Sequence, residues 1–249
     1  MRVRRVNVVF EFNIDRDIIL SIGTKIKSIQ KNFNAKIQML NVPTAVPPDA
    51  PRLIIVIENF VINVSLNRFE YAVEIPPHIN SNINSSLNYV SAKIENIYKY
   101  LVVDNDSYNW SGVVATLEFP SKDKNKSIDL MVPIFDRIIG IDRRGHDLAS
   151  FQLQFGFHEE GIFRNFTLSG YETFNLQLVN PNNSDIVLFE NKLDSEIIES
   201  GISVIVDINN RPQKNHNDAF SEFEKILSDL QSAVKDIPNI LNLGGIVNE

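Results

Sequence analysis

The sequence predicts an α+β fold made of two antiparallel meander-plus-helix halves, with the helices packed on one face of a largely antiparallel sheet. The main reason is a pattern that occurs twice: alternating strands, a turn marked by proline, and then a long amphipathic helix. The first copy ends with residues 69–101 and the second with residues 202–237. We therefore expect an N-terminal half at residues 1–120 and a C-terminal half at residues 121–249, as separate units or as one continuous domain.

In the first half, the spacing of the apolar residues assigns each element. Val6, Val8 and Phe10 alternate with polar residues, which is the period of a strand with one buried face. Asp15 can cap a helix whose apolar residues then recur every three or four positions. The expected strands are residues 3–13, 36–42, 53–57, 60–66, 69–75 and 110–119, and the expected helices are residues 18–33 and 83–101.

The second half follows the same rules, with glycine and proline marking its turns. Pro133 predicts a short, broken helix at residues 128–139, because proline lacks the N–H group that a helix interior needs. Ser169 and Gly170 predict a turn between two strands, and Pro238 predicts the end of the last helix. The expected strands are residues 151–157, 162–168, 171–179, 186–189 and 202–208, and the expected last helix is residues 220–237.

Composition and charge exclude several classes of function. The chain has no cysteine, which excludes disulfides, thiolate nucleophiles and zinc sites with cysteine ligands. Its net charge is −7 and its basic clusters have acidic neighbours, so a role in nucleic-acid binding is disfavoured. The longest aliphatic run, residues 53–57, is too short to span a membrane. We expect a cytoplasmic protein without a cofactor.

The most specific enzymatic pattern is Asp185 followed by Glu190 and Lys192. An Asp with a Glu-x-Lys on a strand can bind Mg²⁺ and activate water, as in restriction-type nucleases. Here both acids fall within one short stretch, whereas those nucleases place the Asp on a separate, earlier strand. An exposed pair of Glu190 and Lys192 on an edge strand is the alternative interpretation.

The densest polar cluster is Arg143, Arg144 and His146, which we consider as a ligand-binding candidate against an ordinary surface loop. None of the four histidines lies three or four residues from another, so we expect no metal site. The chain also has no glycine-rich phosphate loop and no dinucleotide fingerprint.

Four short segments stand in a definite order along the chain: residues 6–12, 51–53, 67–71 and 204–209. Their sequences and order resemble those of a sporadically distributed family of bacterial proteins of unknown function. The similarity covers most of the chain and rests on short apolar motifs, and residues 120–150 depart from the family's pattern. The family has no established catalytic residues, so the resemblance implies only its fold and a non-secreted accessory role, associated with a mobile or defence locus.

Three classes of function remain open. The lack of a catalytic motif favours a non-enzymatic interaction or accessory protein of a bacterial multi-protein system. The alternative is a metal-dependent nuclease or a small-ligand-binding enzyme with its site between the halves. The third is a self-assembling structural protein. Open strand edges and the apolar tail at residues 239–249 also predict association, as a homodimer or with a protein partner.

Overall fold

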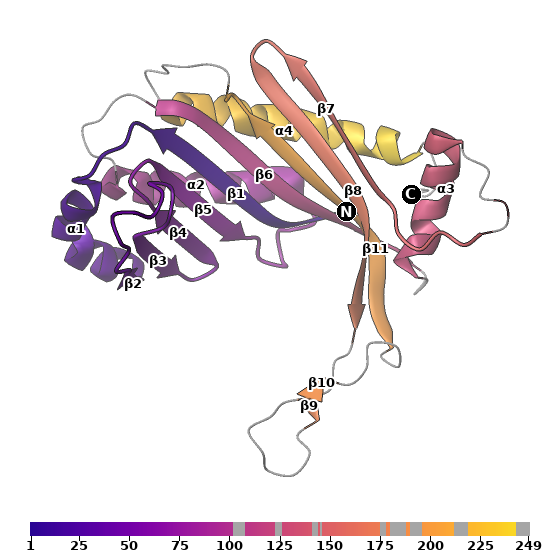
Figure 1. Ribbon diagram of the computed structural model, residues 1–249, viewed down its shortest axis with the longest axis horizontal. Helices are drawn as coiled ribbons and strands as arrows, with labels where there is room; N and C mark the ends of the chain where they lie inside the picture. Colours follow the sequence, from indigo (N-terminus) through magenta and orange to yellow (C-terminus); the bar gives the residue numbers. More distant parts are fainter. Residues whose placement is uncertain are drawn as a thin grey trace.

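The computed structural model describes residues 1–101, 108–122, 126–140, 144, 146–174, 178–179, 188–189, 196–211 and 219–242. The described residues form four helices, a nine-stranded antiparallel sheet and a separate two-stranded ribbon (Figure 1). The α+β fold class that the sequence predicts is therefore confirmed.

The first half begins with a strand and a helix and continues as a four-stranded meander that ends in a second helix. The periodicity assigned both helices to the residue, because their apolar stripes are continuous and become buried. The elements are β1 (Arg2–Phe12), α1 (Ile18–Phe33), β2 (Lys36–Met39), β3 (Leu53–Ile57), β4 (Phe60–Val64), β5 (Arg68–Glu74) and α2 (Ile83–Leu101).

We count the second half from β6, and so from Tyr108 instead of the expected residue 121, because β6 takes the place that β1 has in the first half. This half has the same order, with a shorter meander and a two-stranded ribbon inserted into it. The ribbon consists of two short strands that pair with each other. In the sequence, it lies between two long strands that are neighbours in the large sheet. The elements are β6 (Tyr108–Pro120), α3 (Ser127–Ile139), β7 (Gln152–Glu159), β8 (Ile162–Phe174), β9 (Leu178–Val179), β10 (Leu188–Phe189), β11 (Ile197–Asn209) and α4 (Ala219–Asn242).

The strand order is β2-β3-β4-β5-β1-β6-β11-β8-β7, and it shows how the two halves correspond. In each half, the first strand pairs with the last strand of that half's meander: β1 with β5, and β6 with β11. The first strands β1 and β6 also pair with each other, antiparallel, at the centre of the sheet. The sheet therefore runs through both halves without a break, and its two arms extend in opposite directions from β1 and β6.

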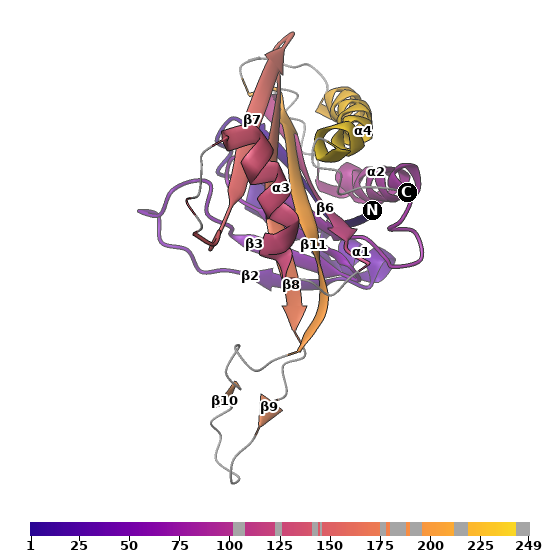
Figure 2. The ribbon, with the colours of Figure 1, turned by 90° about the vertical axis from the view of Figure 1, so that its right-hand side faces the viewer.

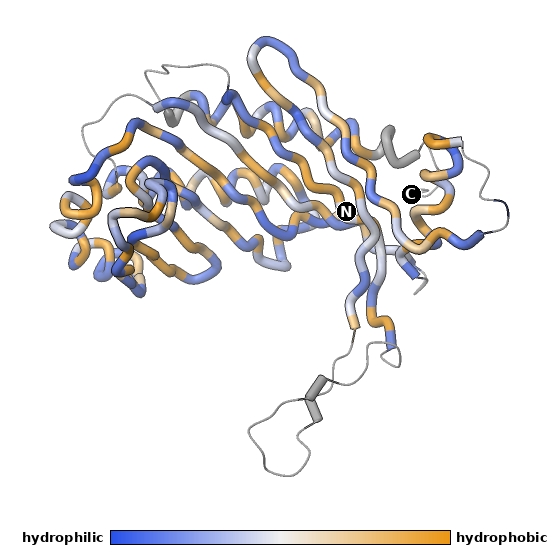
Figure 3. The backbone as a smooth tube through the Cα atoms, in the orientation of Figure 1, coloured by the Kyte–Doolittle hydropathy of each residue, from blue (hydrophilic) through white to orange (hydrophobic). Residues whose placement is uncertain are grey.

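The side chains of the sheet alternate between two faces, which we call the inner face and the open face. The inner face is apolar, and its central side chains are buried. Along the strands, hydrophobic and hydrophilic residues alternate (Figure 3). Paired residues share a face, so the register defines this set across the strands. Its central members are Val6, Val8, Phe10, Val113, Ala115, Leu117, Val204, Val206, Ile208, Phe166 and Leu168.

The helices belong to the inner face. Figures 1 and 2 show α2 and α4 side by side along one side of the sheet, and α4 packs on β6 and β11. Ser127, at the start of α3, lies against Gly170, which follows Phe166 and Leu168 on the inner face of β8. Helix α1 lies next to α2 and β2. No helix of the described residues covers the open face.

Phe10 is the point where the two halves meet in the core. Its ring lies 5.7 Å from that of Tyr71 on β5 and 5.7 Å from that of Tyr98 on α2. It also lies 6.0 Å from the ring of Tyr108 on β6 and 5.6 Å from that of Phe223 on α4. Phe10 is fully buried, so one aromatic side chain of β1 packs against four elements from both halves.

Three details of the predicted elements were wrong. Ser169 and Gly170 do not form a turn, because β8 continues through them and pairs with β11 along both segments. Gly170 is needed there for packing: a Cβ at this position would lie 2.7 Å from the Cβ of Ser127. The last helix does not end before Pro238 either, since α4 extends to Asn242. Helix α3 likewise includes Pro133 within its length.

Leu230→Ala should lower the free energy of unfolding by about 2–5 kcal/mol, because Leu230 is fully buried between α4 and the sheet and its removal leaves a cavity. The matched control is Ser232→Ala, at an exposed position of the same helix, which should stay within about 0.5 kcal/mol of the wild type. Denaturant titration of both variants measures this difference. An unchanged Leu230→Ala variant would contradict the packing of α4 on this sheet.

Candidate functional site

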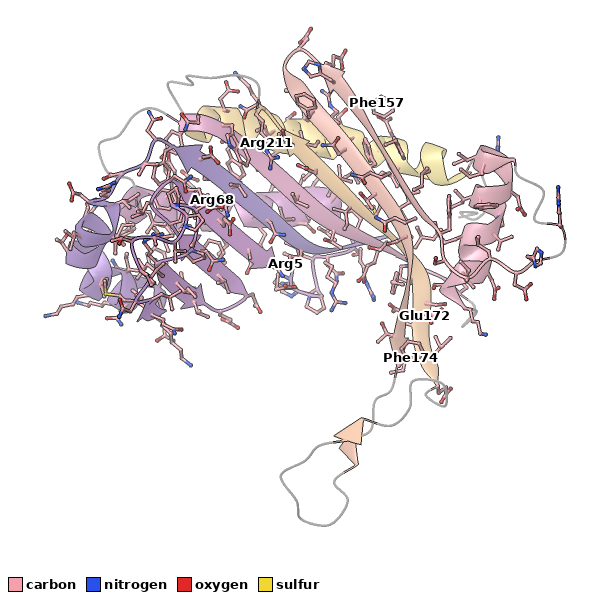
Figure 4. The ribbon with its side chains drawn as sticks, in the orientation of Figure 1. Arg5, Arg68, Phe157, Glu172, Phe174 and Arg211 are labelled. Atoms are coloured by element: carbon pink, nitrogen blue, oxygen red, sulfur yellow. The ribbon has the colours of Figure 1, made fainter. Side chains whose placement is uncertain are left out.

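The open face is the surface of the sheet that no described helix covers, and its side chains come from the alternate positions of the strands. Figure 4 shows Arg5 of β1 and Arg68 of β5 on this side. The polar residues of its first arm form ion pairs with their neighbours: Arg5 with Glu74 at 3.8 Å and Arg68 with Glu70 at 3.0 Å. This part of the face is therefore polar and electrically balanced.

A network of four side chains crosses the open face from β1 to β8. Arg2 Nε donates to a carboxylate oxygen of Glu118 at 2.6 Å, and Arg2 Nη1 donates to Glu199 at 3.0 Å. Arg2 Nη2 makes a second, short hydrogen bond to Glu199. The hydroxyl of Tyr171 donates to Glu199 Oε1 at 2.9 Å. One guanidinium thus joins carboxylates from β6 and β11, and Tyr171 extends the network to β8.

The protonation of this network favours a structural role. Partial burial alone raises the pKa of Glu199, but the hydrogen bonds from Arg2 and Tyr171 outweigh it and hold that pKa below its ordinary value. Burial, and then the hydrogen bond to Glu199, raise the pKa of Tyr171 well above that of a free tyrosine. At neutral pH, therefore, Glu199 is ionised, Tyr171 keeps its proton as a donor, and neither is poised to exchange a proton with a substrate.

Gly201 makes room for this network. Its partner in the register is Tyr171, and a Cβ at position 201 would lie 2.7 Å from the Tyr171 ring and 2.4 Å from the carbonyl oxygen of Phe119. The backbone of β6 cannot move away without breaking the ladder, so only glycine fits at this position. The tyrosine ring can therefore lie across β11 and reach Glu199.

Beside the network, the middle of the open face carries small, uncharged side chains. The register brings Thr116, Ile205 and Thr167 into one row across β6, β11 and β8, and Ser203 and Ser169 pair in the next row. Ile205 is 38% exposed. We call this group the central patch, and it consists of Val114, Thr116, Thr167, Ser169, Ser203 and Ile205.

The far side of the central patch ends at a second group of fixed side chains. The Arg211 guanidinium lies over the Trp110 ring, 4.5 Å from its centre, which is a cation–π contact. Figure 4 labels Arg211. Asn209 donates to Asp207 at 3.0 Å, and Gly112 faces Asn209 across the strands. The central patch is thus bounded at both ends by polar side chains that hold one another in place.

A cavity lies in the second half, between α3, residues 148–152 and the strands β8 and β11. Its volume is about 1090 Å³. Glu172 accepts hydrogen bonds from the backbone N–H of Ser127 at 2.7 Å and from the Ser127 hydroxyl at 2.9 Å, so this carboxylate holds the start of α3. Figure 4 shows Glu172 and Phe174 on the segment where β8 leaves the rest of the sheet.

The candidate residues that the sequence suggested are not brought together in the described part of the chain. Asp185, Glu190 and Lys192 lie outside the described residues, and so does Arg143. Arg144 and His146 are exposed, and Arg144 has a left-handed backbone with φ at 49°. The nuclease and small-ligand interpretations of these residues stay predictions.

The network of Arg2, Glu118, Glu199 and Tyr171 was not found from the sequence. Its members come from four strands and are separated by up to 197 positions. No local spacing marks them, and only the order and register of the strands bring them together. The one indirect signal is the charge of Arg2 and Glu118, each of which falls on a polar position of an alternating strand.

Among the described residues, no three histidine, aspartate or glutamate side chains are placed to hold a metal ion together. None of the described helices has the length and the hydrophobicity needed to cross a membrane. Comparison of the sequence with models of known families and with curated proteins gives no match. The resemblance to a bacterial family of unknown function therefore stays a hypothesis.

Glu199→Gln should lower the free energy of unfolding at pH 7 by about 1 kcal/mol, because the pair with Arg2 is about one-third exposed and is screened by solvent. The pKa of Glu199 is lowered in the folded state. Its stabilising contribution is therefore fully present above the ordinary glutamate pKa of about 4.3 and is lost as the pH falls through the lowered value.

The difference in stability between wild type and Glu199→Gln should consequently shrink below about pH 4. Chemical denaturation across pH 3 to 7 measures it. Glu74→Gln is the control, since Glu74 is half exposed and lies 3.8 Å from Arg5, and we expect little change from it. An equal loss from both variants would show that the Arg2 network is no more than an ordinary surface pair.

Proposed function

We propose that this chain is a non-enzymatic interaction protein that binds a protein partner through the central patch of its open face. The supporting observation is that the middle of that face and its two ends carry different kinds of side chain. Small, uncharged side chains occupy the middle, including the exposed Ile205, while the Arg2 network and the Trp110–Arg211 pair hold both ends. A surface with this composition suits contact with another protein, whose side chains can pack between the polar groups at its two ends.

The charges of the open face favour a protein partner over a nucleic acid. Arg2 and Arg4 both lie beside Glu118, and Arg5 lies beside Glu74, so each of these three cations has an acidic neighbour. Phosphate binding instead needs uncompensated Lys and Arg side chains. The net charge of −7 adds to the electrostatic cost of approaching a polyanion.

The same polar groups support a role without catalysis. Glu199 and Tyr171 hydrogen-bond to each other, and both have pKa values displaced away from neutrality. A general acid or base works best with a pKa near the working pH. The cytoplasmic setting is an expectation from the composition, and the bacterial, defence-associated multi-protein system rests on the sequence resemblance; both are part of the proposal.

The test compares Ile205→Arg with a control variant, Leu20→Arg, during purification from cells that naturally express the protein. Leu20 is an exposed apolar residue on α1, far from the central patch, so both variants place the same charge on an exposed apolar position. A partner that copurifies with the wild type is then produced in pure form and its affinity is measured. We expect Ile205→Arg to weaken binding at least tenfold and Leu20→Arg to leave it unchanged.

Two results would contradict the proposed function. One is a purified partner that binds Ile205→Arg as tightly as wild type, which would place the contact elsewhere. The other is cleavage of single- or double-stranded DNA by the pure chain with Mg²⁺ or Mn²⁺, abolished by Glu190→Gln. That outcome would replace the interaction role with the nuclease alternative.

A further inference from the structure

The outer edge of β7 is the feature of the sheet that the proposed function does not use. Strand β7 is the last in the strand order and pairs with β8 along its whole length, in a register without shifts. No described strand pairs with its other side. Such an edge presents a row of backbone N–H and C=O groups that can accept a further strand.

The two edges of the sheet differ in their protection against pairing with a further strand. The β2 edge has only four residues, begins with Lys36, and is followed by a loop rich in proline. Short length, lysine and proline are the usual means by which proteins protect an edge. Strand β7 has eight residues, contains no Lys, Arg or Pro, and has Glu159 at its end as its only acidic residue.

The correspondence between the two halves identifies what is missing at β7. Counted outward from the centre, β5 corresponds to β11, β4 to β8, and β3 to β7. In the first half β2 then covers the edge of β3, with four paired residues. In the second half, among the described residues, no strand takes the place of β2. The edge of β7 is thus the position where one half lacks a strand that the other half has.

The side chains of β7 favour a partner that is apolar on the inner face. Phe155 stacks on Phe166 with 5.2 Å between the ring centres, and Phe157 lies 6.2 Å from the same ring. Phe157 is nevertheless 58% exposed, at the edge of the sheet (Figure 4). An incoming strand with apolar residues at alternate positions would cover this ring.

We propose that the missing strand is β7 of a second copy of this chain, paired antiparallel about a two-fold axis that passes near Phe155. A two-fold axis perpendicular to the sheet keeps inner faces together, so only residues of the same face can be opposite each other. With Phe155 at the axis, Phe157 of each copy faces Leu153 of the other, which puts three apolar positions of each strand on the inner face.

On the open face, the same register places His158 opposite Gln152, and Gln154 opposite Gly156. Glu159, the acidic residue of β7, lies opposite Phe151 of the other copy, so no two like charges face each other. The strand is therefore complementary to itself. The two nine-stranded sheets become continuous, and both central patches remain exposed on one side, so dimer formation does not depend on the proposed function.

The first test measures the mass of the full chain in solution, against 28.3 kDa for one copy. An eight-residue strand pair is small for an interface, so we expect a dissociation constant on the order of micromolar and about twice the single-chain mass at ~100 µM. Gln154→Lys should raise that constant at least tenfold, because the two lysines become diagonal neighbours on the same face beside the axis. Gln38→Lys, an exposed glutamine on the open face of the other edge strand, is the matched control and should change it less than twofold.

The second test uses the absence of cysteine from the chain. Phe155→Cys places one thiol opposite its own copy, within reach of a disulfide, so mild oxidation should give a covalent dimer. Gln38→Cys should give far less, and circular dichroism checks that both variants fold. A mass of one copy at ~100 µM, a dimer unaffected by Gln154→Lys, or equal cross-linking at positions 38 and 155 would each overturn the proposal.

Discussion

The pairing of β1 with β6 is the constraint on which the rest of the structure depends. Each of these strands is the first of its half, and each also pairs with the last meander strand of that half. Without the central pair, two small sheets would each have an additional open edge and a core too thin to be stable. With it, Phe10 and its neighbours on β1 are covered by α2 from one half and α4 from the other.

The same constraint explains why the open face exists. All the side chains that the helices bury come from one set of alternate positions, so the opposite set remains on a single continuous surface. The Arg2 network spans the central strands on that surface and ties the start of β1 to β6, β11 and β8. The surface that we propose for partner binding is therefore rigid because it lies on the most connected part of the sheet.

Local spacing in the sequence was sufficient to predict the fold class and most of the elements, but not their arrangement. The three-and-four spacing located α1 and α2 because each has a continuous apolar stripe. Ser169-Gly170 was misleading, since the glycine is required by the close approach of α3 and not by a turn. The network around Arg2 could not be predicted, because its partners meet only through strand order and register.

Hydrogen exchange of the native protein tests most directly whether the central pair makes the two halves one unit. The backbone amides of β1 and β5 and those of β6 and β11 should exchange only through global unfolding. They should then share one opening free energy, equal to the value from denaturant unfolding. Two distinct free energies, one for β1 and β5 and another for β6 and β11, would show that the halves open separately and would contradict the central role of the β1–β6 pairing.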